Sequence, residues 1–215
     1  MLISRWFFSS ILVVTLAGCQ SVYYGAMEKA GVHKRDIMID RVESAQESQT
    51  DAKEQFESAL EQYQSIVTIE DQDLVERYEK LNDEYEDSKA AAEEVSERIN
   101  SVEDVSEALF DEWEDEIDLY SNANLKRQSE AKLRQTKKQY EKLINAMRSA
   151  EARMDPVLQV FQDQVLFLKH NLNARAIDSL QGELGNVNTE VAGLIREMEK
   201  SIAESEAFIS SLKND

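Results

Sequence analysis

Few residues in this sequence are of the types that carry out catalysis or bind metal ions. His33 and His170 are the two histidines, and neither has the metal-ligating partner four residues away that a helical zinc site would show. No nucleophile elbow, phosphate-binding glycine loop or metal motif occurs, and the serines are scattered without a His and an Asp beside them. We therefore expect no catalytic residue, no metal site and no cofactor, and we predict that the protein is not an enzyme.

Acidic residues are concentrated in one stretch, residues 103–118, which contains no basic residue. Such a stretch could attract Ca²⁺ or Mg²⁺, but it lacks the Gly and the alternating oxygen ligands of a calcium-binding loop. We interpret it as a solvated helix face. Its acidic members are Glu103, Asp104, Glu107, Asp111, Glu112, Glu114, Asp115, Glu116 and Asp118.

One short segment holds a dense set of varied hydrogen-bonding side chains, and we take it as the candidate interaction surface. Two interpretations are open for it. The side chains could bind a partner or ligand, or they could form an interhelical hydrogen-bond network that fixes the packing register. The residues are Lys169, His170, Asn171, Asn173 and Arg175.

The single cysteine, Cys19, follows an N-terminal apolar segment. Arg5 precedes an apolar run that ends at Leu16, too short to span about 30 Å of hydrocarbon, which predicts a cleaved signal peptide over residues 1–18. Residues 16–19, Leu-Ala-Gly-Cys, resemble the lipobox of bacterial lipoproteins, in which the cysteine is diacylated and becomes the mature N-terminus. We predict that Cys19 is lipidated, which would also explain a cysteine without a disulfide partner.

The residues after Cys19 predict which membrane holds the anchor. Gln20 and Ser21 follow the cysteine, whereas the lipoproteins that this segment resembles stay in the inner membrane mainly when Asp comes first. We expect the outer membrane, with the protein facing the periplasm, and exposure at the cell surface remains open. Residues 19–34 are too few, and too poor in Ser, Gly and Pro, to be more than a short tether.

The composition excludes several fold and partner classes. The 215 residues carry a net charge of −19, which opposes nucleic-acid phosphates and anionic lipids, so we expect no nucleic-acid partner and membrane attachment through the lipid alone. Six glycines and one proline are too few for the turns of a sandwich, barrel or doubly wound sheet. We predict an all-α fold.

Apolar residues recur at spacings of three and four over most of residues 35–215, which predicts one elongated antiparallel helical bundle with coiled-coil-like packing and three or four long helices. One apolar seam ends near Val67, a polar pause follows, and another seam begins at Leu74. The first seam is Val42, Ala45, Gln49, Ala52, Phe56, Ala59, Tyr63 and Ile66. The second contains Leu74, Tyr78, Leu81, Tyr85, Ser88, Ala92, Val95, Ile99, Val102, Ser106, Leu109 and Trp113.

The seam changes phase at residues 121–124, and the charge changes sign there from acidic to basic. A hairpin turn at Asn122 would place the two charge blocks side by side, whereas a skip in one long helix would turn the charges toward other helices. Both interpretations are open. The hairpin would pair Asp118 with Arg127, Asp111 with Arg134, Glu107 with Lys138 and Glu103 with Lys142, and each exposed pair would contribute about 0 to 1 kcal/mol.

Proline marks the next predicted boundary. Asp155 resembles an N-cap and Pro156 a first helical residue, so we expect the last helix to begin at Pro156. Residues 157–168 are apolar on more than one side, which predicts a segment wedged among several helices. Gly182 and Gly185 predict a bend.

Several segments together resemble the gammaproteobacterial lipoprotein family catalogued as domain of unknown function twenty-nine fifty-nine. The resemblance covers nearly the whole mature chain and implies no established activity. The segments that carry it are the lipobox, residues 23–29 (YYGAMEK), 33–37 (HKRDI), 40–43 (DRVE), 109–113 (LFDEW) and 163–174 (DQVLFLKHNLNA).

Long seams without a chemical site favour a noncatalytic envelope scaffold or interaction module that binds a protein partner or associates with itself. Two alternatives are open. The bundle core could hold a small apolar or lipid ligand against Phe161 and Phe167, or the protein could regulate an envelope enzyme by direct contact.

Overall fold

The computed structural model describes residues 24, 27, 31–68 and 73–214, and these form four α-helices with no strand. The helices are α2 (Lys34–Thr68), α3 (Leu74–Asp118), α4 (Ala123–His170) and α5 (Ala174–Lys213). The predicted signal peptide, Cys19 and residues 69–72 lie outside the described residues. The predicted all-α class is confirmed, with four long helices.

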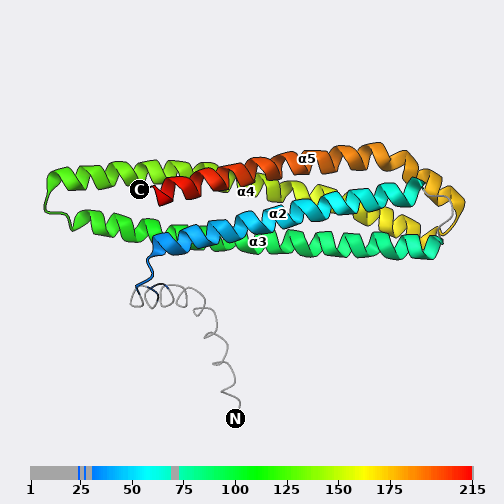
Figure 1. Ribbon diagram of the computed structural model, residues 1–215, viewed down its shortest axis with the longest axis horizontal. Helices are drawn as coiled ribbons and strands as arrows, with labels where there is room; N and C mark the ends of the chain where they lie inside the picture. The colour runs from blue at the N-terminus through cyan, green and yellow to red at the C-terminus, as the bar shows by residue number, and fades with distance from the viewer. Residues whose placement is uncertain (1–23, 25–26, 28–30, 69–72, 215) are drawn as a thin grey trace, which may run out of the picture.

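The helices run alternately up and down and pack side by side in chain order, and α5 returns to pack against α2 (Figure 1). Polar side chains bridge neighbouring helices along the outside. Gln55 of α2 donates to Glu84 of α3 at 2.8 Å, and Gln64 of α2 donates to Asn188 of α5 at 2.9 Å. The predicted elongated antiparallel bundle is therefore confirmed.

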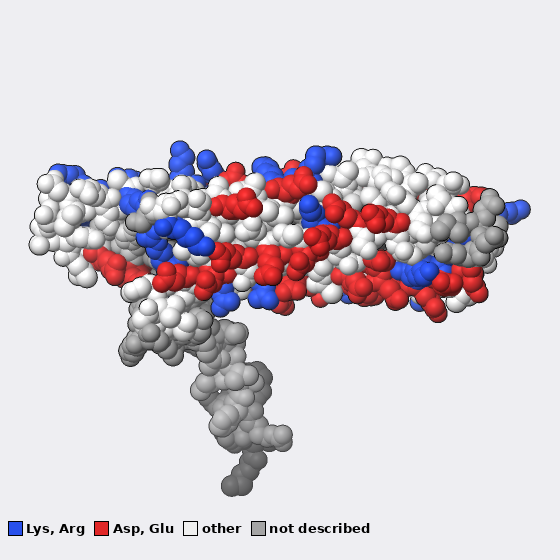
Figure 2. Space-filling model, viewed as in Figure 1, with Lys and Arg blue, Asp and Glu red and all other residues white. Residues whose placement is uncertain are grey.

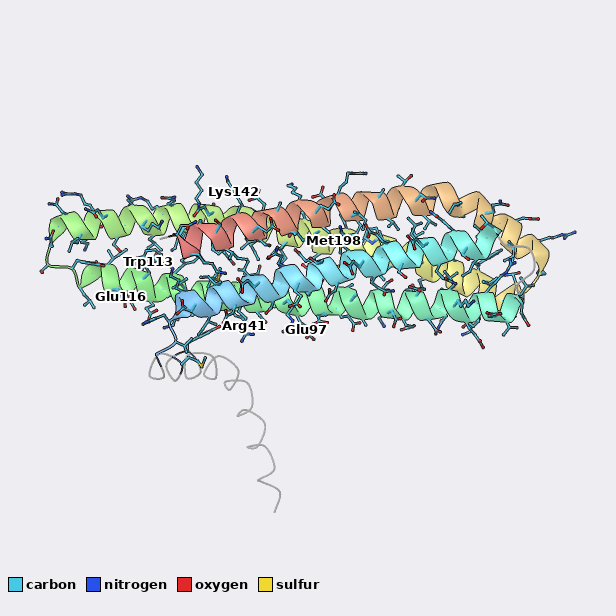
Figure 3. The ribbon with its side chains drawn as sticks, viewed as in Figure 1. Arg41, Glu97, Trp113, Glu116, Lys142 and Met198 are labelled. Atoms are coloured by element: carbon cyan, nitrogen blue, oxygen red, sulfur yellow. The ribbon has the colours of Figure 1, made fainter. Side chains whose placement is uncertain are left out.

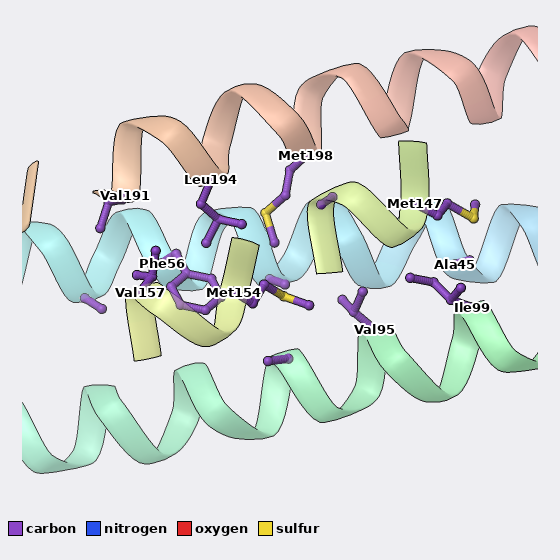
Figure 4. Close-up of a cluster of buried hydrophobic side chains, with 14 of the residues drawn as sticks. Ala45, Phe56, Val95, Ile99, Met147, Met154, Val157, Val191, Leu194 and Met198 are labelled. Carbon is purple, nitrogen blue, oxygen red and sulfur yellow. The ribbon is translucent and has the colours of Figure 1, made fainter. Parts of the chain in front are cut away.

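The predicted seams form the core. Figure 4 shows buried side chains from all four helices pointing toward one another, among them Phe56 of α2, Ile99 of α3, Met154 of α4 and Leu194 of α5. Every member of the first seam is buried, from Val42 to Ile66. A stripe of apolar residues at helical spacing thus packs against three partners, as expected for a bundle whose helices cannot hide it alone.

Short polar side chains begin the helices. The Asp73 carboxylate accepts from the Val75 N–H at 2.8 Å, the Asn122 side-chain oxygen accepts from the Asn124 N–H at 2.9 Å, and Asn173 caps α5. Each cap satisfies a backbone donor that has no partner inside its helix.

Residues near the N-terminal end of α2 make a tight turn. Gly31 has φ 85°, a left-handed conformation that costs glycine little, and the Val32 N–H donates to the Met27 carbonyl at 3.0 Å. Tyr24, before this turn, is buried against the main core. The segment predicted as a tether therefore already packs on the bundle at Tyr24.

The structure decides for the hairpin at residues 119–122 and against a skip in one long helix. The Lys126 ammonium lies 2.9 Å from the Asp118 carboxylate across the turn. The expected partners were wrong in detail, because Arg127 donates to Asn124 instead. Further down the hairpin, Glu103 pairs with Arg148 instead of Lys142. The two blocks of charge meet, but in a register shifted from the one that counting from the turn predicts.

The prediction that the last helix begins at Pro156 is wrong. Pro156 lies inside α4, and the helix break comes later, between His170 and Ala174. Proline removes one backbone bond to the residue four positions earlier, but that residue, Ala152, is solvent-exposed, so water can satisfy its carbonyl. Met154 and Val157 on either side are buried, and their packing holds the helix together.

The segment expected to be wedged among several helices is buried on one side only. Val157, Phe161 and Val165 face the core, whereas Leu166 and Phe167 are exposed. The α5 helix passes through Gly182 and Gly185 without a break in its hydrogen-bonded turns.

Replacing the interior proline should stabilise the protein. We expect Pro156→Ala to raise the free energy of unfolding by about 1–3 kcal/mol, because it restores a backbone donor to the helix. Asp155→Ala is the matched control and should change the stability by less than about 0.5 kcal/mol, since Asp155 is an exposed residue inside a helix and not a cap. Urea denaturation measures both. A loss of about 1 kcal/mol in Asp155→Ala would show instead that a helix begins there.

The buried Tyr63 hydroxyl donates to the Leu180 carbonyl at 2.6 Å and should make stability depend on alkaline pH. Burial, with a smaller contribution from the Glu183 charge, raises the pKa of Tyr63. The stability that the protein gains by burying a protonated Tyr63 is therefore fully present at neutral pH. It is lost as pH rises above about 10, the usual pKa of a tyrosine. We expect Tyr63→Phe to lower the free energy of unfolding at neutral pH by about 0.5–1.5 kcal/mol. On going to alkaline pH, the variant should lose less stability than wild type does. Tyr120→Phe, at an exposed position, should change neither quantity.

Candidate interaction surfaces

The predicted interaction residues gather at the turn between α4 and α5. Lys169 and His170 close α4, Asn171 and Asn173 form the turn, and Arg175 lies in the first turn of α5. All are exposed except Asn171, which is half-buried. We name this set, together with Leu166, Phe167 and Leu172, the turn patch.

The two asparagines of the turn patch make local bonds. The Asn171 amide donates to the Phe167 carbonyl at 2.9 Å, and the Asn173 side-chain oxygen accepts from the Ala176 N–H at 3.3 Å. These bonds end one helix and begin the next. The two asparagines thus shape the turn, and the bonds described for them do not cross to another helix.

The cations of the turn patch differ in how they suit their helices. Lys169 and His170 lie in the last turn of α4, where a positive charge interacts favourably with the helix dipole. Arg175 lies in the first turn of α5, where the dipole disfavours it. None of the three takes part in an ion pair within the described part of the chain. Arg175 is therefore the member of the patch whose position local helix electrostatics does not explain.

Apolar side chains accompany these charges. Leu166, Phe167 and Leu172 are 48%, 39% and 42% exposed. Exposed large apolar side chains that lie close together in the chain and beside cations are typical of a contact surface, whereas scattered single ones are ordinary. The turn patch thus combines exposed apolar side chains with basic ones.

A second surface, which the sequence did not predict, lies at the opposite end of the bundle. There α3 and α4 continue past the start of α2 and the end of α5 (Figure 1). Contacts fix the position of these two ends. Lys34 pairs with Glu112 at 2.8 Å, the Arg35 guanidinium donates to the Leu212 carbonyl, and Ser211 donates to Gln139 at 3.2 Å.

Where α2 and α5 stop, they leave a cavity of about 410 Å³ against the α3–α4 hairpin. We name it the hairpin notch. Figure 3 shows Trp113 between α3 and α4, and Glu116 on α3, both beyond the start of α2. The lining residues are Arg35, Leu109, Glu112, Trp113, Glu116, Lys132, Thr136 and Leu212.

The floor of the notch is a small core of its own. Phe110, Ile117 and Leu133 are buried there, and Trp113 and Tyr140 pack on them. The Trp113 indole N–H donates to the Ser129 hydroxyl at 2.8 Å, which holds the ring across the hairpin. The Thr136 hydroxyl is buried and has no hydrogen-bond partner within the described residues. The α3–α4 hairpin therefore has a packed core of its own beyond the ends of α2 and α5.

The expected ligand chamber beside Phe161 and Phe167 does not match this cavity. Phe161 is fully buried in the main core and Phe167 is exposed in the turn patch, so they face different surroundings. Four of the eight residues that line the notch are charged, which differs from the apolar wall that a lipid-binding chamber requires.

Charges in the hairpin are placed against the dipoles of their own helices. Acidic residues occupy the end of α3, which has no basic residue in its last turn, and Lys126 and Arg127 lie near the start of α4, which has no acidic residue in its first turn. Each arrangement is unfavourable in a single helix. When the two helices lie side by side, the acidic end of α3 and the basic start of α4 attract each other, which offsets the unfavourable interaction of each with its own helix dipole.

Further from the turn, the Arg148 guanidinium donates hydrogen bonds to Glu103 and Glu151, and these acceptors raise the pKa of Arg148.

The described residues contain no helix with the length and apolar character of a membrane span, and no group of three or more His, Cys, Asp or Glu side chains placed to hold a metal ion. A family model described as Protein of unknown function (DUF2959) matches residues 23–212. The chain belongs to this family. No curated protein and no solved structure is significantly similar to it. The matched residues include both the turn patch and the hairpin notch, so both surfaces lie within the family's domain.

The Thr136 hydroxyl gives a test of the notch wall. Because it is buried without a partner, Thr136→Val should leave the free energy of unfolding unchanged or raise it by up to about 1 kcal/mol. Ser201→Ala is the contrasting variant, because the Ser201 hydroxyl donates to the buried Gln49 side chain at 2.8 Å and its loss should cost about 1–3 kcal/mol. Thermal and urea unfolding measure both. A loss in Thr136→Val as large as that in Ser201→Ala would mean that the hydroxyl has a bound partner.

Proposed function

We propose that this protein is a noncatalytic lipoprotein of the outer membrane, facing the periplasm, that acts as a helical scaffold or interaction module of the cell envelope. The turn patch is the observation that carries the proposal. It presents three grouped apolar side chains beside Lys169, His170 and Arg175 at one end of a rigid bundle. The three apolar side chains keep 39% to 48% of their surface exposed, and a contact with another protein would cover it.

The anchor of this proposal comes from the sequence around Cys19. The Leu-Ala-Gly-Cys segment supports lipidation, and two or three acyl chains, at about 0.8 kcal/mol for each buried CH₂, are enough for firm attachment. Tyr24 is already buried against the bundle, five positions after Cys19. A lipidated Cys19 would therefore hold the bundle within a few residues of the membrane.

The charge of the surface is consistent with attachment through lipid alone. The net charge is −19, and Figure 2 shows acidic side chains spread along α2 and α3 on one face of the bundle. Such a surface is repelled by anionic headgroups. The long sides therefore suit solvent, and contacts belong to the ends.

The turn patch also indicates the chemistry of its partner. Exposed basic side chains beside apolar ones complement an apolar surface that carries acidic residues. Such a partner could be an envelope enzyme whose activity the contact regulates, which is the more specific form of the same proposal.

A crosslinking pulldown from intact cells tests the proposal. We expect wild type to recover envelope proteins, and a Lys169→Ala, His170→Ala, Arg175→Ala triple variant to lose at least one of them. A triple variant with Lys89→Ala, Lys142→Ala and Lys200→Ala is the matched control, because these lysines lie on exposed helix faces away from the turn patch, and it should keep all partners.

Two further measurements test the anchor and the absence of catalysis. Palmitate labelling should mark wild type and not Cys19→Ser, and Cys19→Ser should be released from the membrane fraction. Recovery of monomer alone in every crosslinking experiment, or turnover of a substrate by the purified protein, would contradict the proposed role.

A further inference from the structure

We propose that the turn between α3 and α4 inserts shallowly into the lipid bilayer that holds Cys19, so that the bundle stands on the membrane and presents its turn patch away from it. We name residues 119–125 the hairpin tip. This second contact with the bilayer rests on the lipid anchor of the proposed function. Three properties of the tip support it: its place at the anchored end, its uncharged and apolar surface, and its hydrogen-bonded backbone.

The hairpin tip and the anchor lie at the same end of the molecule. The Gly31 turn connects Tyr24 to the start of α2, where Lys34 pairs with Glu112 of α3 at 2.8 Å. Leu119 comes seven residues after Glu112, so the tip begins about 10 Å beyond this pair at 1.5 Å per residue. Figure 1 shows the hairpin projecting past the start of α2. The tip is therefore the part of the described bundle that extends furthest at this end.

The chain between Tyr24 and Cys19 limits how far the bundle can lie from the membrane. Tyr24 is buried against the main core, which fixes its position relative to α2. Five residues span at most about 17 Å when fully extended. A tip that extends about 10 Å past the start of α2 can therefore reach the bilayer that holds the acyl chains of Cys19.

The hairpin tip is apolar on both sides of the turn and carries no charge. Leu119 is 82% exposed, and Tyr120 and Leu125 are also exposed. The whole segment lacks Asp, Glu, Lys and Arg. The charged residues that flank it, Asp118 and Lys126, pair with each other at 2.9 Å. In Figure 2 the end of the molecule at this turn is largely free of charged side chains on the visible face.

This composition suits the boundary between the headgroups and the acyl chains. Leucine side chains gain free energy on leaving water, and tyrosine is enriched at membrane interfaces because its ring is apolar and its hydroxyl is polar. Ser121, Asn122 and Asn124 lie between the apolar residues and would keep the insertion shallow. The net charge of −19 opposes attraction to anionic headgroups, so an uncharged apolar segment is the surface best suited to contact a bilayer.

Backbone N–H groups of the hairpin tip donate within the hairpin. The Leu119 N–H bonds carbonyls in the last turn of α3. The Asn122 side-chain oxygen accepts from the N–H groups of Asn124 and Leu125 at 2.9 and 3.3 Å, and its carbonyl accepts from the Lys126 N–H at 2.9 Å. Because unpaired backbone groups are costly away from water, these bonds lower the free-energy cost of insertion.

Insertion of the tip would orient the whole bundle. The α4 helix runs from the hairpin tip to the turn patch, and its 48 residues extend about 70 Å. With Cys19 and the tip both in the bilayer, α4 would stand away from the membrane, and the turn patch would lie about 70 Å from it. One end of the bundle would then contact lipid while the other binds the protein partner.

A dye at the tip tests the contact in the lipidated protein, purified in a nonionic detergent and reconstituted into phosphatidylcholine vesicles. Leu119→Cys supplies one free thiol for an environment-sensitive dye, because the acyl chain blocks Cys19. We expect the emission of the dye to shift to the blue, brighten by about twofold or more and be quenched by spin-labelled lipids. The matched control is Leu166→Cys, at an exposed leucine of the turn patch, where the dye should keep the emission typical of water.

Charges introduced at the tip test the orientation. With a donor dye attached through Leu166→Cys, energy transfer to an acceptor dye in the bilayer surface should be low. Adding Leu119→Asp and Leu125→Asp should raise the transfer by about twofold or more, because carboxylates oppose insertion and the bundle no longer stands upright. Adding Ala90→Asp and Ala192→Asp instead, at exposed positions on the long sides, should leave it low. Circular dichroism verifies that each variant folds.

The possible failures can be told apart. Uptake of the dye by wild type would show a free Cys19 thiol and would overturn the lipid anchor together with the tip contact. If wild type takes up no dye, an emission typical of water at position 119 on vesicles would overturn the tip contact alone. A change seen only in native envelope membranes would assign the tip to a protein partner instead. Equal energy transfer with and without the tip carboxylates would overturn the upright orientation.

Discussion

The packing of four apolar stripes, one from each helix, against one another determines the rest of this structure. Each helix hides its stripe only because three others supply the facing side chains, as Phe56, Ile99, Met154 and Leu194 do. A chain with one proline and six glycines has few ways to bury such stripes other than to fold long helices back on themselves. Where α2 and α5 stop, two stripes lose their partners, and the hairpin notch is the direct consequence.

Polar interactions specify the arrangement more than they stabilise it. Most ion pairs between helices involve exposed side chains, and such pairs contribute little to stability. They nevertheless distinguish one register from another. In the hairpin, the acidic end of α3 and the basic start of α4 oppose their own helix dipoles and suit each other, which favours reversal of the chain at Asn122. Inside the bundle, the Ser201–Gln49 hydrogen bond links α5 to α2 at one depth.

The long sides and the two ends of the molecule differ in chemistry. Charged side chains cover the sides, whereas the exposed large apolar residues lie mainly at the turns, with Leu119 and Leu125 at one end and Leu166 and Phe167 at the other. A turn exposes apolar residues because fewer helices surround it. Where several such apolar residues lie beside basic side chains, as in the turn patch, they form a surface to which another protein can bind. The sides determine the shape of this family member, and we expect its contacts to be made at the ends.

Local sequence determined which residues are helical and which side of each helix faces the core. The spacing of Val42, Phe56 and Tyr63 predicted a buried stripe, and the phase change with the charge reversal at residues 121–124 limited the possibilities to a hairpin or a skip. The five predicted surface residues do gather at one turn, because they are close together in the sequence. Lipidation of Cys19 remains a prediction, since the residue lies outside the described part of the chain.

Only the tertiary structure decided how far each helix extends and what covers it. Pro156 satisfies every local rule for a helix start, yet packing of Met154 and Val157 carries α4 through it. The exposure of Leu166 and the presence of the hairpin notch both depend on where other helices end. Helix ends that are far apart in the sequence come to lie side by side only when the chain folds. Spacing within a helix is a local property, whereas burial depends on the neighbours that the whole fold supplies.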